Sequence, residues 1–347
     1  ISCSYKENEL MASATPRLLS TAPMMDWTDT HCRYFFRLLS PNSLIYTEMI
    51  PAKALIYGDQ NKYLKFNPLE DPVSLQLGGN DPMELARCAV IAEKFGYSEI
   101  NLNCGCPSDR VVDGEFGVSL MNNPILVKTC MQELIRAVSI PVTIKHRLGI
   151  GPDFNYEYLK RFVETVGESG CTTYIVHARN AILGKLTPSD NRKIPPLNYG
   201  YVYRLQEDFP EFHFILNGGL NSLKTITEEK NRVAGLMIGR AAYQNPYLLA
   251  EADHMLFDSS IQSRHTIANE MQSYAQYQVS DGVTLRLITR CLLGLFKEQP
   301  NARRWRQILS DPEKHYEMGP EIISYALSWV KTKVDSSIES QEFLHAL

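Results

Sequence analysis

Long apolar runs, closely spaced cysteines and low-complexity tracts are all missing from this chain of 347 residues. Its eight cysteines are too sparse for a disulfide scaffold, and no Cys-x-x-Cys pair or zinc-type Cys-to-His spacing occurs, so we expect no metal. No apolar run approaches the ~18 residues of a membrane span, and none follows the charged first residues as in a secretory signal. We expect a cytoplasmic monomer that does not contact a membrane.

An excess of charge of one sign is also missing. With 35 Lys and Arg against 39 Asp and Glu, the net charge is −4, which argues mildly against a nucleic-acid partner. The stretch 286–306 is different, because six basic residues minus one acidic residue give it a charge of +5. It is either a binding surface for a polyanion or a solvated helix face. The residues concerned are Arg286, Arg290, Lys297, Arg303, Arg304 and Arg306, with Glu298 opposing them.

What recurs along the chain is a short β-branched run, a polar or glycine-containing turn and then a helical pattern. Eight such units by about residue 255 match the ~250 residues of a closed (β/α)8 TIM barrel. A doubly wound open sheet is the alternative, but no G-x-G-x-x-G follows the first strand. The predicted strands are 17–22, 43–48, 72–77, 99–103, 141–147, 172–177, 213–217 and 235–239.

Proline and glycine mark the predicted helix ends. Asp81-Pro82 and Asn123-Pro124 predict starts for helices over 83–95 and 125–138, because proline suits the first helical position. Gly96 and Gly167 are predicted to close helices as left-handed residues.

The strand pattern stops after Phe257, and the rest of the chain is predicted to be helical, including 288–296, 303–309 and 322–334. We therefore expect an N-terminal tail (1–15), a barrel (16–257) and a smaller all-helical C-terminal domain (258–347).

Nearly every predicted strand ends in residues that can carry chemistry. The carboxyl ends of barrel strands meet at one rim, where the active sites of this fold lie. Any one of these strand ends would be a weak signal, but eight together predict a site. They are Pro23-Met24-Met25-Asp26, Glu48, Gln76, Asn101 to Pro107, Lys145-His146-Arg147, His177-Ala178-Arg179, Asn217-Gly218-Gly219 and Gly239-Arg240.

The last two strand ends predict a phosphate site. Gly218-Gly219 and Gly239-Arg240 let backbone N–H groups approach a ligand and add a positive charge, at the usual phosphate position of a barrel. The alternative is that the glycines only make tight turns.

Lys145, His177 and Gln76 are the other candidate ligand contacts. A buried ammonium needs an anion, or loses its proton and acts as a nucleophile, unless Lys145 snorkels to water. His177 contacts the same ligand or is a satisfied core histidine. Gln76 offers a donor and an acceptor to a flat heterocycle, or bonds a neighbouring strand.

Cys106 lies between Gly105 and Pro107, on a turn fixed by proline. A thiol held at the rim can give or take a proton. Cys104, two residues earlier, is explained equally well as a small buried residue.

Taken in order, these motifs resemble the signatures of the tRNA-dihydrouridine synthases. The likeness runs from about Thr21 to Arg306, and its most specific part is the Asn-x-Gly-Cys-Pro motif at 103–107. Cys104 departs from the family, which commonly has an apolar residue there, and leaves open a second thiol that could oxidise or compete with Cys106. Three further segments resemble the A-type subfamily, which acts on U20 and U20a of the D-loop: His31 to Phe35, Asn191 to Pro196 and Arg303-x-Trp305-Arg306.

The resemblance implies an FMN enzyme that uses NADPH to reduce uracil in tRNA to 5,6-dihydrouracil. Cys106 would donate the proton to C5, while the flavin delivers hydride to C6. The residues implied to hold FMN are Pro23, Met24, Met25, Gln76, Lys145, His177, Asn217, Gly218, Gly219, Gly239 and Arg240. Those implied to contact the RNA are Asn103, Lys185, Arg192, Arg303 and Arg306.

Three other functions are compatible with the motifs. An FMN barrel enzyme that reduces a free pyrimidine keeps Cys106 but does not need the arginines. A cofactor-free lyase or aldolase would use Lys145 as a Schiff base. An RNA-binding protein on an inactive barrel would need neither Cys106 nor Lys145 as a catalytic group.

Overall fold

The computed structural model of the chain describes residues 17–152 and 155–330, so the predicted tail and the end of the predicted helix 322–334 lie outside the described residues. Eight parallel strands form one sheet in the order β1-β8-β7-β6-β5-β4-β3-β2. The bridge between Ser20 and Leu44 brings β1 beside β2 and closes the ring. The strands are β1 Leu19–Thr21, β2 Ile45–Pro51, β3 Val73–Gly78, β4 Glu99–Cys104, β5 Val142–Arg147, β6 Thr173–His177, β7 His213–Asn217 and β8 Gly235–Ile238.

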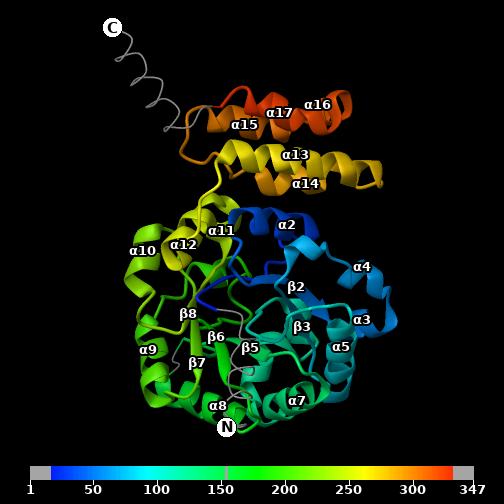
Figure 1. Cartoon of the computed structure of the whole chain (residues 1–347). Coiled ribbons are helices and arrows are strands. Elements are labelled where there is room, and N and C mark those ends of the chain that lie inside the picture. The colour runs from blue at the N-terminus through cyan, green and yellow to red at the C-terminus, as the bar shows by residue number, and fades with distance from the viewer. Residues whose placement is uncertain (1–16, 153–154, 331–347) are drawn as a thin grey trace, which may run out of the picture.

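Helices surround this ring and continue into a separate helical region (Figure 1). The predicted (β/α)8 barrel with helices after it is therefore confirmed. Around the barrel lie α2 Thr30–Leu39, α3 Ala52–Tyr57, α4 Gln60–Leu64, α5 Pro82–Lys94, α6 Asp109–Asp113, α7 Pro124–Ala137, α8 Tyr156–Gly167, α9 Tyr199–Asp208, α10 Leu223–Glu229, α11 Arg240–Gln244 and α12 Tyr247–Phe257. The helical region contains α13 Arg264–Ser280, α14 Leu285–Leu292, α15 Ala302–Leu309, α16 Pro312–Met318 and α17 Ile322–Leu327.

The predicted helix starts are confirmed by their caps. Asp81 accepts hydrogen bonds from the N–H groups of Met83 and Glu84, the second and third residues of α5, and Asn123 accepts one from Leu126 of α7. Gly96 is left-handed (φ +93°) as predicted. Gly167 was assigned the wrong role: it is the last residue of α8, and Gly170 takes the left-handed conformation instead (φ +92°). A side chain at 167 would come within 2.7 Å of the Phe212 ring, so close packing explains this glycine.

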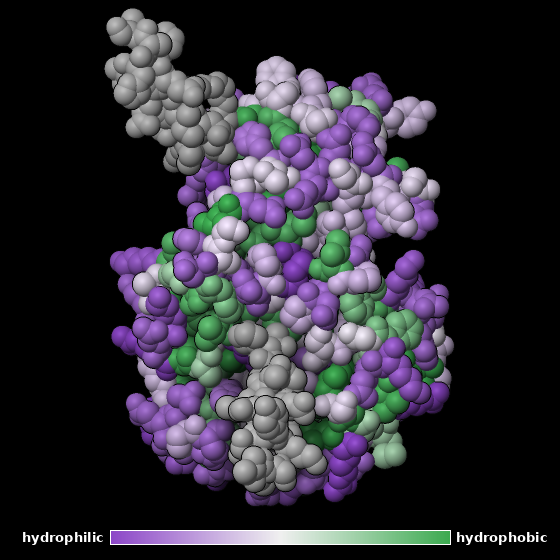
Figure 2. Space-filling model, viewed as in Figure 1, coloured by the Kyte–Doolittle hydropathy of each residue, from purple (hydrophilic) through white to green (hydrophobic). Residues whose placement is uncertain are grey.

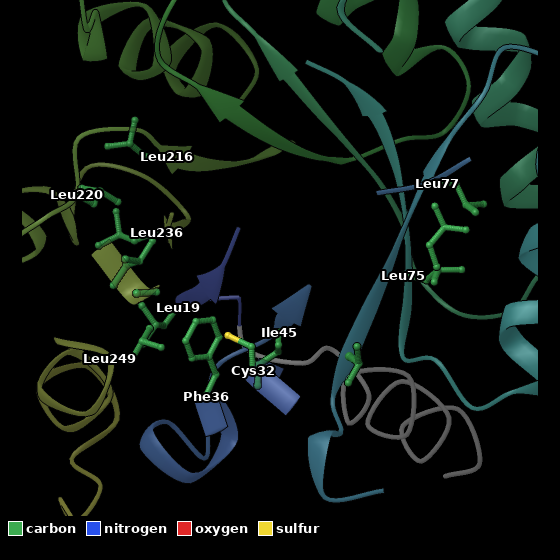
Figure 3. Packing of buried hydrophobic residues seen from close by; sticks show 14 of the residues in the cluster. Leu19, Cys32, Phe36, Ile45, Leu75, Leu77, Leu216, Leu220, Leu236 and Leu249 are labelled. Carbon is green, nitrogen blue, oxygen red and sulfur yellow. The ribbon is translucent and has the colours of Figure 1, made fainter. Parts of the chain in front are cut away.

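The main core lies between the ring and its helices and continues into the helical region. Figure 3 shows Leu19 of β1 and Ile45 of β2 gathered with Cys32 and Phe36 of α2, all of them almost completely buried. Hydrophilic residues spread over the outer helices and the helical region (Figure 2). No helix among the described residues has the length and apolarity needed to cross a bilayer.

The inside of the ring is apolar on one side and polar on the other. Strands β6 to β8 supply Ile175, Ile215 and Met237, which pack with Leu44 and Tyr46 in a small apolar cluster. Strands β3 to β5 face inward with hydroxyl, amide and carboxylate groups bonded to one another. Polar side chains in such a position must satisfy one another, because water does not reach them.

The helical region is held against α2 of the barrel. Tyr274 of α13 stacks on Tyr34 with ring centroids 4.0 Å apart, and its hydroxyl lies 2.8 Å from Nδ1 of His31. Arg290 of α14 donates to Asp29, the N-cap of α2, at 2.5 Å. Arg290 was counted in the predicted basic cluster at 286–306, but its charge is paired with the carboxylate of Asp29 in the barrel.

Candidate active site at the carboxyl ends of the strands

A cavity of about 690 Å³ opens at the carboxyl ends of the strands. This volume suits a ligand of cofactor size. All of the side chains and glycines predicted to bind FMN line it, as do Cys106 and two of the predicted RNA contacts, Asn103 and Arg192. The eleven predicted FMN contacts at the cavity are Pro23, Met24, Met25, Gln76, Lys145, His177, Asn217, Gly218, Gly219, Gly239 and Arg240.

Cys106 lies on a turn that is held from several directions. Its N–H donates to Oδ1 of Asn103 at 3.0 Å, and its carbonyl accepts from Val118 at 3.0 Å. Arg147, buried at the end of β5, donates to the carbonyl of Gly105 at 2.8 Å. The thiol is half-buried, with its sulfur 3.6 Å from the hydroxyl of Ser108. The turn thus presents one thiol to the cavity from a fixed backbone.

Cys104 does not line the cavity. Neighbouring residues of a strand point to opposite faces, so Cys104 faces the outer core whereas Asn103 faces inward. Cys104 is fully buried, and burial raises the pKa of its thiol well above the usual value. The thiol of Cys104, which the sequence suggested could oxidise or compete with Cys106, therefore faces the outer core and not the cavity.

Lys145 supplies a half-buried ammonium near the thiol turn. Its Nζ donates to Oδ1 of Asn217 at 2.9 Å, which joins β5 to β7 across the barrel. Burial lowers the pKa of Lys145 to about 7; the nearby Arg147 guanidinium lowers it too, and Cys106 acts in the opposite direction. A lysine in this state gains from a ligand that brings negative charge.

Positive charge gathers along the wall of the cavity. Arg179, Arg192 and Arg240 line it, and burial together with the nearby Arg240 lowers the pKa of both Arg179 and Arg192. Burial and the surrounding cations also depress the pKa of His177 strongly, so its ring is neutral near pH 7. Such a group of cations favours an anionic ligand.

Two of these three guanidinium groups have a donor without a partner among the described residues. Within residues 17–152 and 155–330, Nε of Arg179 and Nε of Arg192 are buried without a hydrogen-bond partner. Gly218 and Gly219 are left-handed (φ +110° and +73°) and form the turn beside them. Unpaired buried donors are costly, so they indicate a ligand rich in acceptor oxygens, such as a phosphate.

The sequence missed other residues around the cavity. Arg179 could have been assigned a role, because it follows β6 directly. Asn245 gave no such signal. Lys297 lines the cavity from the helical region, and only its place in the basic stretch marked it.

Three predicted RNA contacts lie outside the cavity. Lys185 is exposed in the segment between β6 and α9, and Arg303 and Arg306 are exposed on α15. No group of three or more His, Cys, Asp or Glu side chains in the described part of the chain could hold a metal ion.

Fold and site together define a barrel enzyme whose cavity brings one thiol together with a group of cations. The model of the family described as dihydrouridine synthase (Dus) matches residues 20–328. The chain is also similar to a solved structure of 2-naphthoyl-CoA reductase in complex with 2-naphthoyl-CoA. The TM-score is 0.52 at 9% identity, over 67% of this chain and 49% of that one, so the match shows a similarity of fold alone.

Curated proteins named tRNA-dihydrouridine(20/20a) synthase are similar over most of the chain. The one from Synechocystis sp. is 47% identical over 321 residues, covering 92% of this chain and 96% of its own. The one from Vibrio cholerae is 46% identical over 313 residues (89% and 95%), and that from Pseudomonas syringae pv. tomato 49% over 296 residues (85% and 88%). The chain belongs to the dihydrouridine synthase family. It is an oxidoreductase, because forming dihydrouridine adds two hydrogens across the uracil double bond.

Proposed function

We propose that this protein reduces uridine to 5,6-dihydrouridine at positions 20 and 20a in the D-loop of tRNA, with bound FMN and with NADPH as the reductant. The observation that carries the proposal is the convergence on one cavity of Cys106 and all of the strand-end residues that resemble the family's flavin contacts. The positions follow the names of the curated relatives.

The residues that line the cavity suit FMN chemically. Met24, Met25 and Met49 give it an apolar part, and Gln76 offers an amide donor and acceptor to the edge of a planar ring. The unpaired Nε donor of Arg179, with the nearby Arg240, Gly218 and Gly219, suits the phosphate. A phosphate there also relieves the mutual repulsion of these cations.

FMN, when bound, supplies hydride for C6 of the uracil. The proton for C5 comes from Cys106, whose sulfur faces the same cavity from a turn held by Asn103 and Arg147. Lys145 would provide an ammonium that stabilises negative charge developing on the flavin, which lowers the free energy of the charged transition state. Cys106 is thus the acid, and Lys145 supplies electrostatic support.

A uracil inside folded RNA cannot reach this cavity without leaving its stack, which takes a few kcal/mol. Binding of the surrounding RNA must supply that energy. We infer that residues 258–347 form a tRNA-binding domain after a catalytic barrel at 16–257, with Arg303 and Arg306 on the phosphates and Lys185, Arg192 and Asn103 nearer the base. Lys297, which reaches the cavity from the helical region, lies between the two groups.

A substrate comparison tests this function. We expect the FMN-loaded enzyme with NADPH to form dihydrouridine in tRNA and to leave free uridine unchanged, measured by mass spectrometry of the digested RNA. Reduction of free uridine with unmodified tRNA would favour the small-molecule oxidoreductase instead. A colourless preparation that does not bind FMN would favour the lysine-based lyase.

Replacing Arg303 and Arg306 together with alanine should weaken tRNA binding and flatten its dependence on salt, while FMN stays bound. Both guanidinium groups are exposed on α15, and each phosphate contact contributes ~0.7–0.9 to the slope of log affinity against log salt. The slope should therefore fall by about 1.5 if both contact phosphates. Titrations of tRNA at several salt concentrations measure it.

The matched control is Lys94→Ala with Lys224→Ala, which removes the same charge from exposed sites on the barrel helices α5 and α10. The control should keep the wild-type slope. A double arginine variant with an unchanged slope would rule out the assigned role of α15.

A further inference from the structure

A carboxylate is buried at the start of β4, far along the strand from the cavity. Glu99 is 1% exposed, and its Oε2 accepts two hydrogen bonds from Arg17, at 2.9 and 2.5 Å. Its Oε1 accepts from the hydroxyls of Tyr46, Ser74 and Thr143 at 2.6, 2.8 and 2.8 Å. Glu99 is the acceptor in each of these bonds.

From Thr143 a chain of hydrogen bonds runs through the polar side of the ring to the thiol turn. Asn101 donates to Oγ1 of Thr143 at 2.8 Å, and Gln76 donates to Oδ1 of Asn101 at 2.8 Å. Asn103 donates to Oε1 of Gln76 at 2.7 Å. Its own Oδ1 accepts from the N–H of Cys106 at 3.0 Å. The chain therefore links a buried carboxylate to two residues of the site.

The direction of every bond follows from the first one. A carboxylate has no hydrogen to donate, so the hydroxyl of Thr143 gives its single hydrogen to Glu99 and can only accept from Asn101. Asn101 then turns its carbonyl to Gln76, and Gln76 in turn presents its carbonyl to Asn103. A side-chain amide has two orientations of nearly the same shape. Because Thr143 must donate to Glu99, only one of the two orientations is possible for each of Asn101, Gln76 and Asn103.

We propose that Glu99 is a positioning residue for the strand-end site, acting through Thr143 and Asn101 to hold Gln76 and Asn103 in one orientation. Glu99 itself does not line the cavity and lies about 13 Å from Asn103, at ~3.3 Å per strand residue. Held this way, Gln76 keeps one N–H and one oxygen lone pair for a ligand, and the turn of Cys106 stays closed. The proposal rests on the proposed function only where flavin binding is the readout.

Thr143→Val tests this with Ser74→Ala as its matched control. Each removes one hydroxyl that donates to Glu99 at 2.8 Å, but only Thr143 passes a bond onward. In flavin-free protein, we expect Thr143→Val to speed deuterium exchange in the 103–107 peptide by about tenfold, the size expected for one buried hydrogen bond. FMN affinity should fall by a similar factor, and Ser74→Ala should leave both near wild type.

Two further variants keep the test decisive. Thr143→Ser restores the hydroxyl and should restore both readouts, whereas Asn101→Leu cuts the chain one step later and should repeat the loss with the bonds of Glu99 intact. Equal effects of Thr143→Val and Ser74→Ala, or no rescue by serine, would overturn the proposal. If the wild type did not bind FMN, the proposed function would fail, and the exchange comparison would still decide the role of Glu99.

Discussion

Cys106→Ala should abolish dihydrouridine formation while FMN and tRNA remain bound. The thiol is presented to the cavity from the turn at 103–107 and is the proposed proton donor, and removing such an acid typically lowers the rate ~10²–10⁴-fold. Among the described residues the sulfur contacts the hydroxyl of Ser108 and hydrogen-bonds none of the residues proposed to hold the phosphate, so FMN binding should survive. Single-turnover formation of dihydrouridine, with flavin absorbance and tRNA affinity measured on the same preparation, checks this.

Cys104→Ala is the matched control, because it removes a thiol two residues away on the opposite face of β4. It should keep wild-type turnover after correction for any loss of thermal stability. Full activity of Cys106→Ala would show that the proton comes from another group, and an inactive Cys104→Ala that folds normally would return the second thiol to the mechanism.

Lys145→Met should weaken FMN binding by about 10- to 100-fold, the effect of losing a hydrogen bond from a charged group in a buried site. The wild type should also bind FMN less tightly as the pH rises above about 7, because Lys145 then loses its proton in the flavin-free protein. The methionine variant should lack this part of the pH dependence. Fluorescence titrations of FMN between pH 6 and about 9 measure both effects.

The same residue sets a dependence of stability on pH. The pKa of Lys145 is lower in the folded flavin-free protein (about 7) than the ordinary value of 10.5, so the unfolded chain binds more protons between these values. The contribution of Lys145 to the free energy of unfolding therefore rises with pH across that window and is lost in Lys145→Met. Lys193→Met, which removes an exposed lysine from the segment after β6, is the control. An identical pH dependence in Lys145→Met would exclude Lys145 as the titrating group.

The barrel and most of the cavity could be predicted from the sequence because both follow local patterns. β-branched runs mark the strands, and residues at strand ends meet at one rim whatever the loops do. That rule alone placed Gln76, Lys145 and the paired glycines at the cavity. It also marked Arg179, whose unpaired nitrogen becomes visible only when its neighbours are placed.

What could not be predicted depends on contacts between distant segments. The pairing of Arg290 with Asp29 joins residues 261 positions apart, and no pattern around Arg290 distinguishes it from the exposed arginines of α15. The partners of Glu99 depend on the strand register, which places Ser74 and Glu99 side by side. Gly167 was misjudged because its neighbour Phe212 lies far along the chain.

The contact between Asp29 and Arg290 has a mechanical consequence. Asp29 caps α2 and lies three residues after Asp26, which lines the cavity. One short segment therefore both lines the cavity and contacts the helical region through Arg290. If tRNA docks on that region as proposed, this contact would hold it at a fixed distance from the opening of the cavity. Only a nucleotide at the matching distance along the docked RNA would then enter.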